Sequence, residues 1–381
     1  MSTPLNFNTY LKRKPVVLIV PLDWGLGHAT RCIPIISHLL HIGCKVIVGA
    51  EGAQKALILN EFPHINIVTI NGYRLNYGKS GWHTRWKIML QSSKILMRIK
   101  EEKKWLDQFL EQQPVDLIIS DNRYGLYSKK VKSIFISHQL AIQTGMGSMA
   151  DRLLQRLNYH FIEKFSACWI PDEAGENNLA GLLSHPKKFP ALPLQYIGSL
   201  SRFKKGINDA NCSDQTLNVH TSMKLLIILS GPEPQRSIFE KILLKELKHY
   251  HEPAIFVRGL PDEIDQKTDF NQVSFYNHLS AKSLHEKVNE ADIIISRSGY
   301  STVMDMIPLG KKCVFVATPG QSEQEYLAKY LQGKNLCVAV DQDKFSLRNA
   351  IEQVKLMNAP LIPDTFDSYQ SALEELIQQL R

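Results

Sequence analysis

The stretch DIIISRSGYSTVMDMIPLGKKCVFVATPGQSEQEYLA, residues 292–328, contains the clearest structural pattern in the sequence. The apolar run 293–295 predicts a buried strand, and residues 301–307 have apolar side chains at helical spacing. The proline and glycine of residues 308–310 end that helix, because proline interrupts helices and glycine adopts the backbone conformations that follow them. A second strand, residues 313–317, precedes a turn and another helix. The pattern predicts a strand–loop–helix unit repeated twice along a parallel α/β sheet.

The loop after the first of these strands is suited to binding an anion. Ser298–Gly299 directly precedes a helix, whose first turn presents free N–H groups and the positive end of the helix dipole. Asp305 lies on the same helix face as Ser301, where its carboxylate can accept hydrogen bonds from sugar hydroxyls. Gln324 and Glu325 add polar groups at the start of the second helix. The pattern favours a nucleoside diphosphate sugar, although an ordinary pair of capped helices would share it.

Residues 297–328 resemble the donor-sugar signature of the MurG-like glycosyltransferases. This family has the GT-B fold and includes the lipid-linked N-acetylglucosaminyl transferase of peptidoglycan synthesis. The resemblance implies that an acidic residue on the first helix holds the ribose and that a Gln-Gln pair on the second reads the donor sugar. Here Asp305 replaces the family's Glu, and Gln324–Glu325 replaces Gln-Gln. These two differences leave the identity of the donor sugar undetermined. The matching donor-binding positions are Arg297, Ser298, Gly299, Thr302, Asp305, Gln324 and Glu325.

Length and composition set limits on the class of protein. With 381 residues, 44% of them apolar, the chain is long enough for two domains with separate cores. The net charge of +8 predicts an anionic partner, which could be a nucleotide, a nucleic acid or an acidic membrane surface. The six cysteines form no metal-binding spacing, so we expect buried reduced thiols. No run approaches the roughly 20 apolar residues that span a bilayer, and no signal peptide is evident, so we expect a cytoplasmic protein.

A glycine-rich loop, Gly25–His28, follows the apolar strand 16–20. A dinucleotide-binding fingerprint would need a third glycine where Thr30 stands, which disfavours a nicotinamide or flavin enzyme even though Glu51 occupies the place of a ribose-binding acid. The sequence GxGHxxR instead resembles the N-terminal loop of the MurG-like family. That resemblance implies that Gly25 and Gly27 let the backbone approach the donor diphosphate.

His28 is the first candidate for the catalytic base. It lies between a glycine and a helix start, and its ordinary pKa near neutrality suits a base that deprotonates an acceptor hydroxyl. The protonated imidazole could instead steady the leaving diphosphate, and the sequence leaves both roles open.

Polar residues follow two further apolar strands, 116–120 and 133–137, at the end of each strand. Ligands meet open α/β sheets at this edge, so these residues are candidates for the acceptor side of the site, although strand-end residues also cap helices. Asp121 and His138 are further catalytic candidates, and the acceptor-binding candidates are Asn122, Arg123 and Gln139.

The segment 79–105 is basic and aromatic, and from Trp86 onward its apolar residues recur at helical spacing with cations between them. An interfacial helix docks on anionic lipid in this way. A helix packed on its own domain with a solvated basic face would give the same pattern. RNA binding is less favoured, because the aromatic residues do not alternate along a strand as a base-stacking surface requires.

A second α/β unit begins with the strand 224–229, and its loop resembles the Gly-Gly-Ser-Gln-Gly-Ala-Arg loop of the family. Pro232 and Pro234 remove backbone donors that the family loop has, so side chains would supply the lost contacts. The donor-binding candidates here are Ser230, Gly231, Gln235 and Arg236. The resemblance further implies that the segment 276–279, with Tyr276 and Leu279, borders the nucleobase.

Asp341 and Asp343 form a DxD pair, which binds metal in another glycosyltransferase fold. Because the pair lies between a strand and a helix, we expect Asp343 to be a helix N-cap and predict no metal site. We also expect no cofactor, with the nucleotide sugar serving as co-substrate.

The resemblance implies a GT-B architecture, with two Rossmann-like domains facing a central cleft. We assign residues 1–200 to an acceptor domain, 201–222 to a linker and 223–364 to a donor domain, with the helix 365–381 packing back on the first domain. The predicted reaction moves a hexosyl group, N-acetylhexosaminyl groups included, from a UDP-sugar to a hydroxyl acceptor such as a lipid-linked one, with inversion and without metal.

Two alternatives remain. A sugar-nucleotide 2-epimerase of the same fold would convert the donor alone, and a non-catalytic nucleotide-sugar- or RNA-binding protein would tolerate the loss of His28. On the first interpretation the protein could also associate with the cytoplasmic face of a membrane.

Overall fold

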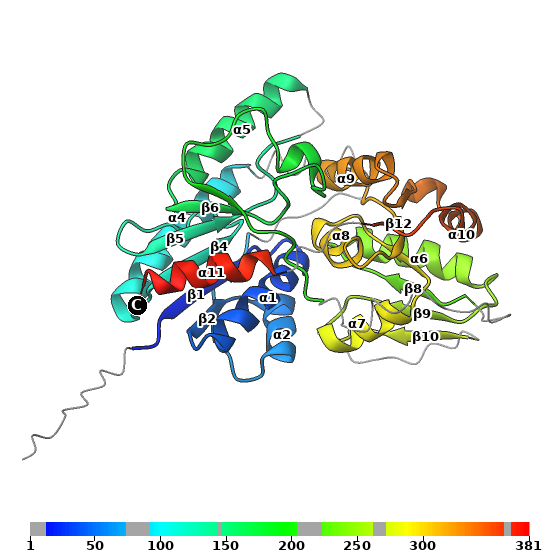
Figure 1. Ribbon diagram of the computed structural model, residues 1–381, viewed down its shortest axis with the longest axis horizontal. Helices are drawn as coiled ribbons and strands as arrows, with labels where there is room; N and C mark the ends of the chain where they lie inside the picture. Colours follow the sequence, from blue (N-terminus) through cyan, green and yellow to red (C-terminus); the bar gives the residue numbers. More distant parts are fainter. Residues whose placement is uncertain are drawn as a thin grey trace, which may run out of the picture.

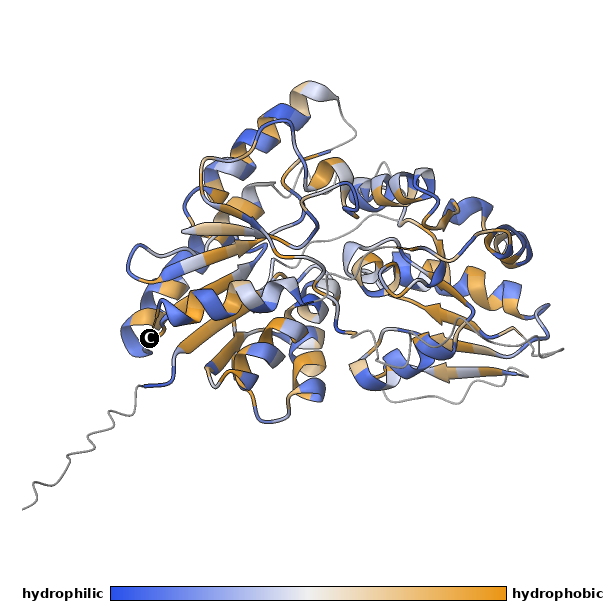
Figure 2. Ribbon diagram, viewed as in Figure 1, coloured by the Kyte–Doolittle hydropathy of each residue, from blue (hydrophilic) through white to orange (hydrophobic). Residues whose placement is uncertain are grey.

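A computed structural model describes residues 13–73, 92–143, 147–203, 223–261, 272–361 and 367–380. These residues form two parallel β-sheets, each covered by helices, and the two sheets lie beside one another (Figure 1). The strands are the most hydrophobic segments of both domains (Figure 2). They are apolar along most of their length because a parallel sheet with helices on both faces is buried on both sides.

The first sheet has the strand order β3-β2-β1-β4-β5-β6-β7, and all of its neighbouring strands are parallel. Its strands are β1 (Val16–Pro21), β2 (Lys45–Gly49), β3 (Asn66–Val68), β4 (Leu117–Asp121), β5 (Lys132–Ile136), β6 (Ala167–Ile170) and β7 (Leu194–Tyr196). The helices of this part are α1 (Gly27–His41), α2 (Gly52–Glu61), α4 (Ser92–Gln112), α5 (Ser148–Ile162) and the short η1 (Gly181–Leu183).

The second sheet has the order β10-β9-β8-β11-β12-β13, again with parallel neighbours. Its strands are β8 (Leu225–Ile228), β9 (Ala254–Val257), β10 (Val273–Tyr276), β11 (Ile293–Ser296), β12 (Lys312–Phe315) and β13 (Val338–Ala339). The helices that follow are α6 (Gln235–Leu247), α7 (Ala281–Glu290), α8 (Tyr300–Met306), α9 (Ser322–Gly333), η3 (Gln342–Lys344), α10 (Leu347–Lys355) and α11 (Ser368–Gln378).

Each sheet reverses its strand order at one point, between β1 and β4 in the first sheet and between β8 and β11 in the second. Ligands of open α/β sheets bind beyond the carboxyl ends of the strands at such a switch point. The glycine-containing loops after β1, β8 and β11 therefore lie where a ligand would be expected. A hydrogen bond described below joins the loop after β1 to the helix that follows β11.

The two domains are connected by packed segments of chain. The C-terminal helix α11 lies against α1 of the first domain, where Glu374 accepts a hydrogen bond from His38 Nε2 at 3.1 Å (Figure 1). The start of the predicted linker is also packed, since Phe203 is 1% exposed and its ring stacks on that of His285 in α7. Residues 204–222 lie outside the described part of the chain.

Two further predictions can be compared with the fold. The five cysteines in the described ranges are buried and free, as expected of reduced thiols. Among the helices that the structure describes, none combines the length and apolar character needed to cross a bilayer.

Candidate active site

The loop after β1 turns into α1 at Gly27, and His28 lies in the first turn of that helix. Gly25 has a φ of +75°, a conformation that favours glycine. A Cβ added at Gly25 would meet no atom within 4 Å, so the backbone there borders open space. His28 is thereby placed at the first switch point, beside the end of β4.

Asp121 ends β4 and is fully buried beneath His28. Arg31, one turn further along α1, holds this carboxylate with two nitrogens: Nε donates to Oδ2 at 2.7 Å and Nη2 donates to Oδ1. Burial alone would raise the pKa of Asp121, but Arg31 and His28 outweigh it and lower the pKa to about 2. Asp121 is therefore an anion across the physiological range, paired in a two-pronged geometry that fixes the position of both partners.

His28 Nδ1 lies 3.2 Å from Asp121 Oδ2 and 2.9 Å from Arg31 Nη2. Burial and the neighbouring Arg31 lower the pKa of His28 below its ordinary 6.5, so the neutral imidazole is favoured at pH 7. The two contacts require opposite tautomers, because the carboxylate needs a proton on Nδ1 and the guanidinium needs a lone pair there. In the tautomer that Asp121 selects, Nε2 carries a free lone pair, as a general base requires.

His138, predicted as another base, has both ring nitrogens occupied. Nδ1 lies 3.0 Å from Arg31 Nη1, and Nε2 lies 2.9 Å from Glu323 Oε1 in the second domain. Its ring stacks on Tyr300, the first residue of α8, with centroids 4.1 Å apart. We therefore assign His138 to connecting these groups, since it keeps no free lone pair to take a proton from an acceptor.

The acceptor-side predictions divide into two groups. Asn122 and Gln139 are half-buried at the ends of β4 and β5, next to Asp121 and His138, where contact with an acceptor is feasible. Arg123 is 1% exposed and donates to Glu102 Oε1 at 2.6 Å and to backbone carbonyls. A buried ion pair inside the first domain thus occupies its guanidinium, and its acceptor role stays a prediction.

At the second switch point the loops are open and rich in small residues. Gly231, with a φ of +111°, and Gly299 both border space in which an added Cβ would meet nothing within 4 Å. Ser298 Oγ donates to Gln324 O at 2.9 Å, which ties the loop after β11 to the start of α9. Ser301 Oγ donates to Gly27 O at 2.8 Å and so joins the two switch points directly.

The two arginines predicted to bind the donor are engaged by protein groups. Arg297 is 1% exposed and donates to the carbonyls of Val316, Ala317 and Gln235 and to Gln342 Oε1. Burial lowers its pKa to about 9, and its guanidinium lies 4.3 Å from the centroid of the Phe239 ring. We therefore assign Arg297 to holding the loops at the ends of β8, β11 and β12 together.

Arg236 pairs with Glu233 at 2.8 Å and with Glu240 at 2.9 Å, and Ser230 is only half-buried at the loop before it. Two carboxylates therefore pair with its charge, and its donor contact stays a prediction. Gln235 is 1% exposed at the start of α6, where its carbonyl accepts from Arg297.

Asp305, predicted to bind the ribose, is 3% exposed on α8. Its Oδ1 accepts from Ser201 Oγ at 2.9 Å and from the Arg202 backbone N–H at 3.2 Å, and its Oδ2 accepts from Arg202 Nε at 3.1 Å. Burial raises the pKa of Asp305, with Arg202 opposing that rise. In this structure Asp305 holds the chain segment between the domains, and the ribose contact, which would require that segment to move, stays a prediction.

The remaining donor-side candidates keep partly exposed positions. Thr302 is half-buried in the first turn of α8. Tyr276 ends the edge strand β10 and Leu279 follows it, and both are half-buried. Gln324 Oε1 accepts from Thr318 N at 2.9 Å and Glu325 Oε1 accepts from Gly320 N at 2.8 Å. These two side chains thus brace the turn between β12 and α9 at the edge of the site.

Comparison with known proteins agrees with this arrangement. Residues 262–380 match the family model of the glycosyltransferase family 28 C-terminal domain. The UDP-N-acetylglucosamine--N-acetylmuramyl-(pentapeptide) pyrophosphoryl-undecaprenol N-acetylglucosamine transferase of Buchnera aphidicola subsp. Schizaphis graminum is 25% identical over 348 residues, covering 87% of this chain and 86% of that protein.

Solved structures match along nearly the whole chain. MurG of Acinetobacter baumannii has a TM-score of 0.52 at 15% identity and covers 96% of this chain and 100% of its own. The glycotransferase of kitacinnamycin has a TM-score of 0.59 at 12% identity, covering 97% and 96%. The chain resembles the MurG-like glycosyltransferases along most of its length. The GT-B fold and the resemblance expected from residues 297–328 are confirmed.

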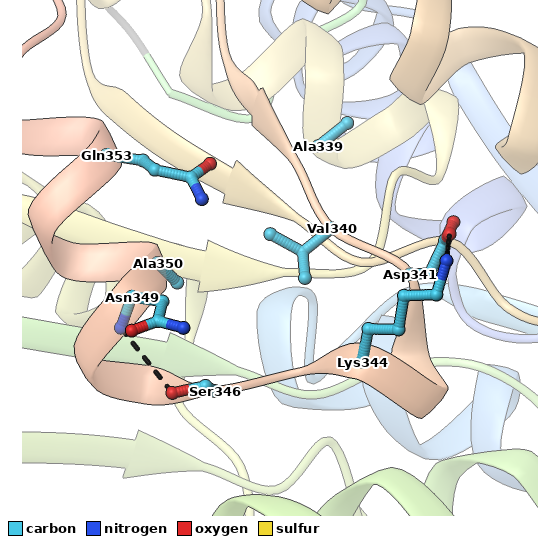
Figure 3. Close-up of a pocket in the computed structure, with 8 residues that line it drawn as sticks. All are labelled: Ala339, Val340, Asp341, Lys344, Ser346, Asn349, Ala350 and Gln353. Atoms are coloured by element: carbon cyan, nitrogen blue, oxygen red, sulfur yellow. Dashed lines mark hydrogen bonds and ion pairs between the residues drawn. The ribbon is translucent and has the colours of Figure 1, made fainter.

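The DxD pair follows the edge strand β13, two strands away from β11 in the second sheet. Asp341 pairs with Lys344 at 3.8 Å, and a hollow of about 260 Å³ opens beside them at the end of the edge strand β13 (Figure 3). It is smaller than the roughly 300–1,000 Å³ typical of ligand pockets. It is lined by Ala339, Val340, Asp341, Lys344, Ser346, Asn349, Ala350 and Gln353.

The predicted N-cap at Asp343 is wrong. Ser346 caps α10 instead, because Asp343 lies in the short helix η3 while the Ser346 side chain accepts from the Asn349 N–H. Within the described ranges, no three His, Cys, Asp or Glu side chains are grouped as metal ligands would be.

Two residues that sequence reasoning left out of the site, Arg31 and Glu323, occupy central positions in this network. Arg31 is three residues after His28, so the two share a face of α1, and this spacing could have revealed it. Glu323 reaches His138 only because the two domains meet, and the sequence contains no signal for that contact.

Proposed function

We propose that this MurG-like glycosyltransferase transfers an N-acetylhexosaminyl group from a UDP-sugar to a hydroxyl of a lipid-linked acceptor, with inversion and without a metal ion. The observation that carries the proposal is the buried His28–Asp121 pair, which stands at one switch point and is joined by the Gly27–Ser301 contact to the open glycine loops of the other. A base thus faces the region where a donor would lie.

The chemistry follows from this placement. The acceptor hydroxyl gives its proton to His28 Nε2, and its oxygen attacks the anomeric carbon as the bond from that carbon to the diphosphate oxygen breaks. Direct displacement inverts the anomeric centre. Asp121, an anion at any physiological pH, stabilises the imidazolium that forms and keeps Nδ1 protonated.

The departing diphosphate gains negative charge that the protein must stabilise. Since Arg236 and Arg297 are bound to protein groups, we assign this task to backbone N–H groups of the loops at Gly231 and Gly299 and to the positive ends of α6 and α9. The open space around both glycines would let phosphate oxygens approach the main chain closely.

The choice of donor and acceptor class rests on the relatives. The Buchnera protein acts on UDP-N-acetylglucosamine and a pyrophosphoryl-undecaprenol acceptor by its name, so UDP-N-acetylglucosamine is the first donor to test. A 2-epimerase would convert the same donor with no acceptor, which separates it from a transferase by product.

A lipid-linked acceptor would bring the protein to a membrane, and α5 offers a surface for this. Met149, Leu153 and Leu157 recur at helical spacing and are 79%, 66% and 41% exposed, with Arg152 and Arg156 exposed between them. The helix lies at the outer side of the first domain, with hydrophobic and polar residues alternating along it (Figure 2). Apolar side chains flanked by cations suit an anionic bilayer surface.

The predicted membrane segment 79–105 is described only from residue 92. There, Ile99 and Leu106 of α4 are buried in the first domain, so the main apolar face of this helix packs on its own domain. Leu96 and Met97 remain exposed, 40% and 57% respectively. We therefore place the membrane contact primarily on α5.

The transfer reaction is tested by measuring UDP release from UDP-N-acetylglucosamine, with and without lipid extract and magnesium, for the wild type and His28→Ala. We expect His28→Ala to lower kcat about 10²- to 10⁴-fold while the thermal shift on adding UDP-N-acetylglucosamine is unchanged. Normal turnover in His28→Ala would overturn the catalytic assignment. A wild-type protein with no thermal shift for any UDP-, GDP-, dTDP- or CMP-sugar would overturn the donor site.

The membrane contact is tested by co-sedimentation with vesicles of phosphatidylglycerol and phosphatidylcholine. We expect Leu153→Asp with Leu157→Asp to abolish sedimentation, whereas Leu356→Asp, a change at a 90% exposed leucine of the second domain, should leave it intact. Equal sedimentation of both variants would rule out α5 as the docking surface.

A further inference from the structure

His138 has its tautomer fixed by two partners. A guanidinium only donates hydrogen bonds, so Nδ1 of His138, 3.0 Å from Arg31 Nη1, must be the acceptor. The proton is then on Nε2, which donates to Glu323 Oε1 at 2.9 Å. His138 therefore links Arg31 in the first domain to Glu323 in the second, because it accepts a hydrogen bond from the former and donates one to the latter.

The second domain holds this histidine at two places. Tyr300 of α8 stacks on the imidazole with an angle of 16° between the rings, and Glu323 of α9 accepts from its edge. Because a stacked ring with a fixed hydrogen bond retains little rotational freedom, the position of His138 depends on how the second domain sits against the first.

Arg31 links His138 to the catalytic pair. Its Nη1 contacts His138, its Nε and Nη2 contact Asp121, and its Nη2 also lies 2.9 Å from His28 Nδ1. The guanidinium is planar and rigid, so it cannot turn at one nitrogen without changing its contacts at the others. Any displacement of His138 would therefore change the contacts that Arg31 makes with both His28 and Asp121.

We propose that Glu323 is a positioning residue that, through His138 and Arg31, aligns His28 and Asp121 for catalysis when the donor domain is seated against the acceptor domain. This inference rests on the proposed function, because it takes His28 as the base. Glu323 directly precedes Gln324, a predicted donor-sugar residue in the same first turn of α9. Donor binding at that turn would thus be communicated to the base across the domain boundary.

The charges around His138 also indicate that Glu323 affects His28. It is faced by Arg31 from α1, Glu323 from α9 and Tyr300 from α8, with His28 and Asp121 beyond Arg31. Burial would raise the pKa of Glu323, but His138, His28 and Arg31 outweigh it, and the carboxylate is ionised at neutral pH. Its negative charge is in turn one of the influences that raise the pKa of His28.

Three variants test the proposal through UDP release from UDP-N-acetylglucosamine by the full chain. Glu323→Ala removes the hydrogen bond and the charge, whereas Glu323→Gln keeps an acceptor for His138 and removes only the charge. Tyr330→Phe is the matched control, because it removes another interdomain hydrogen bond of α9, from the Tyr330 hydroxyl to Asn178 Oδ1 at 2.7 Å.

For Glu323→Ala we expect kcat to fall about tenfold or more, within the range of general-base effects, with the KM for UDP-N-acetylglucosamine changed less than about twofold. The acid limb of kcat/KM should move to lower pH, because a charge that raises the pKa of His28 is gone. Glu323→Gln should recover much of kcat but keep the shifted limb, and Tyr330→Phe should change neither.

The proposal is overturned if Glu323→Ala and Tyr330→Phe have the same kcat and pH profile, or if Glu323→Ala changes only KM. If the wild type releases no UDP, the proposed function fails instead, and the chain of contacts is judged by ¹⁵N NMR of the histidine side chains. A proton on His138 Nε2 in the wild type, lost or mixed in Glu323→Ala, supports the link. A proton on Nδ1 in the wild type overturns it.

Discussion

The two switch points of the molecule are built from different chemical groups. At the first, His28, Arg31, Asp121 and His138 form a buried network in which charged side chains contact one another. At the second, the loops at Gly231 and Gly299 border open space, and the guanidinium groups of Arg236 and Arg297 bind other groups of the protein. The contrast suggests that the first domain supplies the proton chemistry through side chains and the second supplies donor binding through backbone.

The largest expected effect comes from breaking the first network at Asp121. Asp121→Asn should lower kcat/KM about 10²- to 10⁴-fold, because the amide neither stabilises the imidazolium nor selects the productive tautomer of His28. It should also destabilise the fold by roughly 3–5 kcal/mol, since Arg31 is left buried without its counter-charge.

Steady-state kinetics and urea unfolding measure the two consequences of Asp121→Asn. Asp107→Asn on α4, which breaks an exposed pair with Lys103, is the control and should change neither by much. Full activity in Asp121→Asn would show that the network is structural only.

The pH dependence sharpens the assignment of the base. Because the pKa of His28 is lowered from 6.5, kcat/KM should fall as the pH decreases through that lowered pKa, by about tenfold per pH unit below it. The same shift affects stability: below pH 6.5 the unfolded chain binds the proton more readily than the folded one, so stability falls as pH falls. An acid limb centred above 6.5 would contradict this environment for His28.

The second switch point is tested by closing its open space. Gly299 has a φ of −69°, so alanine can adopt its backbone conformation, and the added methyl group would project where phosphate oxygens are expected. Gly299→Ala should weaken UDP-N-acetylglucosamine binding about tenfold, or 1.4 kcal/mol, with little change in the melting temperature of the free protein. Isothermal titration and thermal unfolding provide the two readouts.

Gly27→Ala is the informative partner of Gly299→Ala, because its new Cβ would meet Ser301 Oγ at 2.8 Å and so press on the contact between the domains. If Gly299→Ala bound the donor as tightly as the wild type, backbone recognition at this loop would be disproved.

The smallest effect is expected from removing a cation that looks functional in the sequence. Arg236→Met should change the affinity for UDP-N-acetylglucosamine by less than about twofold, or roughly 0.4 kcal/mol, because Glu233 and Glu240 already neutralise this guanidinium. Titration with the nucleotide sugar measures the effect. A tenfold loss of affinity would return Arg236 to the donor site and weaken the contrast between the two regions.

Much of the fold was predictable because its strands are short apolar runs between polar loops. The strand expected at 16–20 is β1 at Val16–Pro21, and the strand expected at 224–229 is β8 at Leu225–Ile228. The site followed in part, since the parallel sheet brings the residues after β1, β4 and β5 to one edge. Asp121 and His28 could be paired on that basis.

The contacts that could not be predicted share a physical cause. A sequence displays a charge without displaying its partner, and the partners of Arg123, Arg236 and Arg297 are 21 residues away, on a neighbouring helical turn, or backbone carbonyls. The partners of Asp305 and Glu323 belong to the other side of the domain boundary. The periodicity of apolar residues in a sequence contains no information on how two domains pack against each other.

The return of α11 to the first domain has a mechanical consequence. The chain passes from the first domain to the second after Leu200 and comes back before Ser368, so the two halves are tethered twice rather than once. Two connections allow the domains to hinge apart but prevent them from rotating freely against each other. A single protease cut in residues 204–222 should therefore leave both fragments associated in native gel filtration and separated only in denaturant.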